Sequence, residues 1–127
     1  MTTRSNGIKW LKENHPEYQG KNRVSKLYSA DESWSKSKVW WFEFPESDIT
    51  DDLSGFQNLL CNKNSNSEHF HLIRVPNSFL IKFKNGLYLR NKKGISTFSI
   101  YLSANPEDMY VEQRGEKHIE FGDFSYE

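Results

Sequence analysis

The sequence predicts an α+β protein with two short helices packed on one face of a mostly antiparallel sheet of about five to six strands. Two segments place apolar residues at helical spacing, and several others alternate apolar with polar residues. Turn dipeptides separate the alternating segments. The 127 residues suit one domain, with a helical or irregular part at 1–37 and a strand, a helix and an antiparallel meander at 38–127.

A helix is expected in the N-terminal segment SNGIKWLKENHPEY, which carries an apolar stripe. Ser5 or Asn6 would cap it, and the helix would end before Pro16, because the residue preceding a proline avoids helical dihedrals. The polar stretch at 16–37 is expected to be irregular and to be anchored by Trp34, among other residues.

The segment KVWWFEF predicts a strand, because aromatic and β-branched residues favour extended backbone. Alternation places Trp40, Phe42 and Phe44 on one face and Trp41 with Glu43 on the other. The wholly aromatic face should be the core face. Trp41 is then the ring that remains for contact with a partner.

The segment SDITDDLSGFQNLLC, residues 47–61, predicts the second helix. Ile49, Leu53, Phe56 and Leu60 recur at spacings of four, three and four residues, as on one face of a helix. Its early aspartates suit the positive end of a helix dipole.

The rest of the chain predicts antiparallel strands. HFHLIRV is expected to be a strand that stops at Pro76, and Asn85-Gly86 predicts a hairpin turn between two apolar runs. An alternative is a helical turn at 77–83, directly after the proline. A turn at NKKG, a strand at ISTFSIYLS and two short strands at MYVEQRG and HIEFGDF would follow.

A basic block suggests a binding surface. The net charge is zero, yet residues 61–94 carry seven basic groups and one acidic group. Basic side chains among exposed rings are typical of surfaces that hold nucleic-acid backbones and stack bases. Lysines that protect an edge strand from aggregation are the alternative interpretation. The predicted binding residues are Lys36, Lys38, Trp41, Arg74, Lys82, Lys84, Tyr88, Arg90, Lys92 and Lys93.

No motif predicts a catalytic residue, a cofactor or a metal ion. His69 and His71 would share one face of a strand, but zinc would need a further ligand that converges on them. A metal-independent ribonuclease needs a general base, a general acid and a cation. His71, Glu112, Arg114 and His118 offer these groups, and the sequence leaves open whether they converge.

The function that we expect is a small non-enzymatic binding module that engages nucleic acid or a nucleoprotein through the basic hairpin and aromatic side chains. The alternatives are a phage or mobile-element protein that inhibits a nucleic-acid-processing enzyme, and a small metal-independent ribonuclease. A single cysteine, Cys61, and no apolar run near the roughly 18 residues of a membrane span favour a cytoplasmic, reducing location without a membrane partner.

Overall fold

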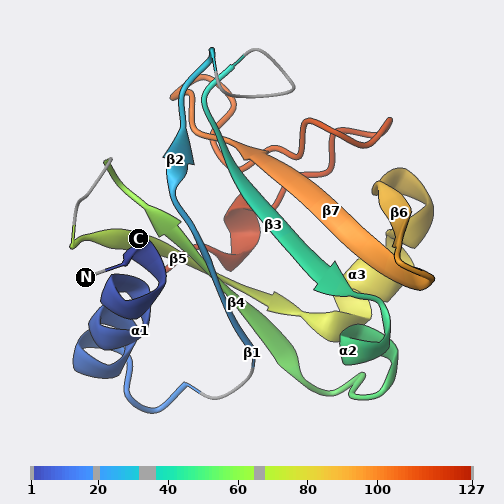
Figure 1. Ribbon diagram of the computed structural model, residues 1–127, viewed down its shortest axis with the longest axis horizontal. Helices are drawn as coiled ribbons and strands as arrows, with labels where there is room; N and C mark the ends of the chain where they lie inside the picture. Colours follow the sequence, from blue (N-terminus) through green and yellow to red (C-terminus); the bar gives the residue numbers. More distant parts are fainter. Residues whose placement is uncertain (1, 19–20, 32–36, 65–67, 127) are drawn as a thin grey trace.

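The computed structural model describes residues 2–18, 21–31, 37–64 and 68–126, and its strands form two sheets (Figure 1). The three-stranded sheet has the order β1 (Lys21–Ser25), β4 (Phe56–Asn62) and β5 (Phe70–Pro76). The four-stranded sheet has the order β2 (Leu27–Tyr28), β3 (Val39–Pro45), β7 (Ile95–Ser103) and β6 (Leu89–Lys92). Among the strand pairs of these described residues, β1–β4 alone is parallel. The α+β class and the mostly antiparallel pairing are thus confirmed, with the strands divided between two sheets.

The main core lies between the two sheets, and the aromatic face of β3 fills much of it. Trp40, Phe42 and Phe44 are each at most 2% exposed, as the alternation predicts. They pack with side chains of β4, β5 and β7, including the buried Cys61. Each buried ring removes a large apolar area from water, so these three side chains supply a major part of the stabilisation.

Helix α1 (Thr3–Asn14) covers the other side of the three-stranded sheet, away from β3 and β7 (Figure 1). Leu11 of the helix packs on Leu60, Phe70 and Leu72 in a second, smaller core. The helix ends before Pro16, as predicted, but its cap is Thr2, whose Oγ1 accepts a hydrogen bond from the Ser5 amide. The three-stranded sheet is therefore covered on both faces.

The helix predicted at 47–61 is wrong beyond its first turn. Only α2 (Ser47–Thr50) is helical, and β4 begins at Phe56. As the central strand of its sheet, β4 is covered on both faces, so its apolar residues run without alternation. Leu59 points into the main core and Leu60 toward α1, whereas Leu53, placed on the predicted apolar stripe, is 54% exposed.

The hairpin predicted at Asn85-Gly86 is also wrong, and the alternative helical turn after Pro76 is right. Helix α3 (Asn77–Lys82) and a 3₁₀ turn, η1 (Lys84–Gly86), occupy this segment. The hairpin lies at NKKG, where β6 and β7 pair around Lys93 and Gly94. Both turn residues have positive φ, 55° and 83°, as a two-residue type I′ hairpin requires.

Two further expectations need correction. The stretch expected to be irregular contains β1 and β2, which carry the chain from one sheet to the other. The two strands expected near the C-terminus are reduced to bridges, Leu102 with Glu112 and Val111 with Glu120, followed by the 3₁₀ helix η2 (Gly122–Phe124). Trp34 lies outside the described residues. Among the residues described, none of the helices is long and apolar enough to cross a membrane.

Two leucine truncations distinguish β4 from the helix that the spacing predicts. Leu59→Ala should lower the free energy of unfolding by about 2–5 kcal/mol, because Leu59 is fully buried in the main core. Leu53→Ala should change it by less than about 0.5 kcal/mol, because Leu53 is largely in water. Urea unfolding of both variants checks this. A helix with Leu53 on its buried stripe would give the reverse order.

Candidate nucleic-acid interface

The outer face of the four-stranded sheet, the face turned away from the core, gathers rings and cations. Alternation along β3 and β7 puts Trp41 opposite Tyr101 and Glu43 opposite Ser99 on this side. The ring of Trp41 is half-buried and meets Tyr28 and Tyr101 edge-on, at centroid distances of 5.9 and 5.8 Å. The outer face, as used below, comprises Tyr28, Trp41, Glu43, Tyr88, Arg90, Lys92, Lys93, Ser99, Tyr101 and Arg114.

Arg114 makes cation–π contacts with two of these rings. Its guanidinium carbon is 4.1 Å from the ring centroid of Tyr88 and 5.0 Å from that of Tyr101. Its Nη1 donates to Ser99 Oγ at 2.6 Å, and Trp41 Nε1 donates to the same oxygen at 3.0 Å. One buried hydroxyl therefore ties the cation to the indole and fixes both on the sheet.

The buried carboxyl group of Glu112 shapes the turn that carries Arg114. Its Oε2 accepts hydrogen bonds from the amides of Tyr101 (2.8 Å) and Arg114 (3.1 Å), and its Oε1 accepts one from Gly115 (2.5 Å). A Cβ at Gly115 would collide with the carbonyl oxygen of Gly86, so the turn needs glycine there. Burial raises the pKa of Glu112 and outweighs these hydrogen bonds, which lower it.

Glu43 organises the cations at the other end of the outer face. Its carboxylate pairs with Arg90 Nε at 3.2 Å and with Lys92 Nζ at 3.3 Å, and its side chain is only 14% exposed. A hollow of about 240 Å³ opens here, and it is lined by Glu43, Phe44, Pro45, Lys92, Lys93, Ile95 and Thr97.

The structure separates the predicted binding residues of the basic block. Tyr88, Arg90, Lys92 and Lys93 do lie together on or beside β6, and Trp41 joins them across the sheet. Lys38 is exposed where β3 begins. Lys82 belongs to α3, and Lys84 pairs with Glu46 and lowers the pKa of that carboxyl group. Lys36 lies outside the described residues.

Arg74 is separate from the cations of β6, because it lies on the three-stranded sheet. Its guanidinium packs over the rings of Tyr18 and Phe56, at 4.6 and 4.1 Å. Its strand position, in phase with Phe70 and Leu72, is on the side that α1 covers. Arg74 therefore does not belong to the outer face.

The four groups that a metal-independent ribonuclease would need do not all meet at one site: Glu112 holds the turn of Arg114, but His71 lies apart from both. His71 packs against Trp40 and Tyr110 on the core side of β5, whereas Arg114 lies beyond β7 on the outer face. Glu112 is fully buried, and His118 is exposed. Across the described ranges, no group of three or more histidine, cysteine or acidic residues is placed to hold a metal ion.

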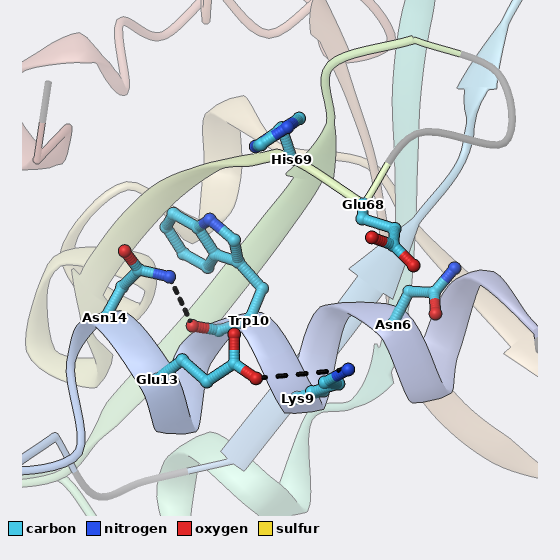
Figure 2. Close-up of a pocket in the computed structure, with 7 residues that line it drawn as sticks. All are labelled: Asn6, Lys9, Trp10, Glu13, Asn14, Glu68 and His69. Atoms are coloured by element: carbon cyan, nitrogen blue, oxygen red, sulfur yellow. Dashed lines mark hydrogen bonds and ion pairs between the residues drawn. The ribbon is translucent and has the colours of Figure 1, made fainter.

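A second hollow, of about 210 Å³, lies between α1 and the start of β5. Figure 2 shows Trp10 rising from the helix toward the strand, with Lys9 and Glu13 on the helix surface and Glu68 above. Lys9 and Glu13 are paired at 4.0 Å, which leaves the charge of Glu68 unbalanced within this hollow. It is therefore unsuited to a polyanion, and the outer face is the better candidate.

Sequence reasoning missed Tyr28 and Tyr101 and considered Arg114 only as a catalytic cation. Tyr101 was detectable, because alternation along ISTFSIYLS puts it beside Ser99. Tyr28 and Arg114 come from segments without a clear pattern, and only the fold brings them to this face. Comparisons of the chain with protein-family models, curated proteins and solved structures found no match.

The carboxyl group of Glu112 should give the fold a measurable pH dependence. Its pKa is raised in the folded chain above the ordinary value of 4.5, so folding favours the protonated form. Protonation of Glu112 therefore increases the free energy of unfolding as the pH falls from above the raised pKa toward 4.5. This stabilisation is lost again as the pH rises through the raised pKa.

The variant Glu112→Gln has no carboxyl group at this position, so it lacks the pH-dependent stabilisation. The stability difference between the wild type and the variant should shift in favour of the wild type on acidification. Urea unfolding of both proteins at several pH values measures this shift, and other carboxyl groups cancel in the comparison. A difference that stays constant with pH would contradict the raised pKa.

Proposed function

We propose that this protein is a small intracellular binding module that holds single-stranded nucleic acid on the outer face of its four-stranded sheet. One observation carries the proposal: Arg114 is held against the rings of Tyr88 and Tyr101, and it shares the hydroxyl of Ser99 with the half-exposed ring of Trp41. The intracellular location rests on the chain having a single cysteine, Cys61, which excludes a disulfide within the chain.

The charges of this face suit a polyanion. Arg90 and Lys92 pair with Glu43, Lys93 lines the same hollow, and Arg114 adds a fourth cation at Ser99, opposite Glu43 in the sheet. Glu112, which holds the turn of Arg114, is fully buried, so its carboxyl group does not form part of this surface. Cations in excess attract phosphate groups and release counterions when they bind them, which is the main source of affinity for nucleic acids.

The rings favour a single strand over a duplex. Tyr88 and Trp41 present ring surface to solvent, and unpaired bases can stack on such rings or on an arginine plane. A sheet face also differs from the helices that commonly enter the major groove of DNA. No helix covers the outer face in the part of the chain that the structure describes.

Binding to a labelled single-stranded oligonucleotide of about 12 residues, followed by fluorescence anisotropy, tests the proposal. The logarithm of the association constant should fall linearly with the logarithm of salt concentration, by about 0.7 for each phosphate neutralised. Arg114→Ala should weaken binding by about 1–3 kcal/mol through the lost stacking, and should flatten the salt slope by about 0.7.

Two variants control this experiment. Arg114→Lys keeps the charge but not the plane that stacks, so it should recover the salt slope and not the full affinity. Lys12→Gln removes an exposed cation of α1, which packs on the other sheet, and should change neither quantity. Absence of oligonucleotide binding at low salt would reject the proposal and favour a protein partner instead.

A further inference from the structure

We propose that the hollow at the β6–β7 end of the outer face is a nucleotide subsite in which Glu43 is a positioning residue. Arg90, Lys92 and Lys93 would hold a phosphate group, and the base or sugar of the same nucleotide would lie against Ile95 and Pro45. This inference rests on the proposed function, because it names where one unit of the bound strand sits.

Three strands bring the two halves of this subsite together. Thr97 of β7 lies between Pro45 of β3 and Arg90 of β6, and Lys92 lies opposite Ile95. The hollow of about 240 Å³ between them is smaller than a pocket for a drug-sized ligand, and so suits one part of a longer chain.

The apolar half is open to solvent. Ile95 is 53% exposed, and it lines the hollow together with Pro45. Nucleobases pack against apolar side chains as well as aromatic ones, and isoleucine and proline both serve this purpose in nucleic-acid-binding proteins. A nucleotide would therefore account for both the exposed isoleucine and the cations beside it. A purely apolar partner would not need the cations.

The basic half is ordered by Glu43. The carboxylate takes Arg90 through Nε, which leaves the two terminal amino groups of the guanidinium without a partner among the described residues. Two such groups form the fork that binds phosphate with two parallel hydrogen bonds. The other carboxylate oxygen holds Lys92, and the shared anion lowers the repulsion between the two cations.

Lys93 adds a third cation from a backbone that is already fixed. It and Gly94 form the two-residue turn, and the Gly94 amide donates to Asn91 Oδ1 at 2.7 Å. Its side chain is exposed and lines the hollow. Only the lysine side chain has to be ordered when a phosphate binds, so the entropy cost is small.

Glu43→Gln gives a result that simple charge counting does not. The variant removes a negative charge from a surface for a polyanion, so charge counting predicts tighter binding. A positioning role predicts roughly fivefold weaker oligonucleotide binding and a salt slope that is flatter by about 0.7 to 1.4, because one or both cations lose their placement. Glu43→Asp should recover part of both. Binding by Glu43→Gln as tight as that of the wild type, or tighter, would overturn the positioning role.

Lys93→Asn tests the subsite without a risk to the fold. Asn-Gly is the preferred sequence of a type I′ turn, so the hairpin should form at least as well as in the wild type. Oligonucleotide binding should weaken about two- to fivefold, and the salt slope should flatten by about 0.7. Lys12→Gln again serves as the control, and urea unfolding confirms that both variants are folded.

The failures of the two proposals are distinct. If the wild type binds no oligonucleotide, the proposed function and this inference both fall. If the wild type binds and Arg114→Ala weakens binding, but Glu43→Gln and Lys93→Asn match the wild type, the interface stands and the subsite is rejected.

Discussion

Strand β3 separates two chemical environments, and the rest of the structure depends on that separation. Trp40, Phe42 and Phe44 face the opposite sheet, whereas Trp41 and Glu43 face outward. A slip of one residue against β7 would expose three rings and bury a carboxylate, so burial fixes the register. The core of this sheet and its outer face are therefore set by the same alternation.

The fixed register gives the outer face its rigidity. Because Trp41 is held opposite Tyr101, its indole nitrogen reaches the hydroxyl of Ser99, two residues earlier on β7. The same hydroxyl holds Arg114, and the buried Glu112 holds the turn from which Arg114 extends. Charged side chains on a surface usually lose much rotamer entropy on binding. Here folding has already ordered Arg114, so less rotamer entropy would be lost when a partner binds to this face.

The sequence predicted elements whose chemistry is local. Strands β3 and β7 are recognisable from residue type and alternation, and α1 from its apolar stripe and the proline after it. Strand β4 was misread because a strand covered on both faces loses its period of two, and Phe56 and Leu60 then happened to match helical spacing. Buried amides add to the ambiguity: Gln57 donates to Asn77, and Asn58 donates to Asn22, which only the folded sheet makes possible.

The site was predictable only in part, because charge along a chain and charge in space are different quantities. The basic block at 61–94 spans two sheets, so Arg74 ends on the α1 side while Arg90 and Lys92 reach the outer face. Arg114 joins them from an acidic segment, in which the carboxyl group that holds its turn, that of Glu112, is fully buried. A chain of zero net charge can thus build a face where cations exceed carboxylates, without a basic sequence motif that would reveal it. The place of Arg114 on this face therefore needed a three-dimensional argument.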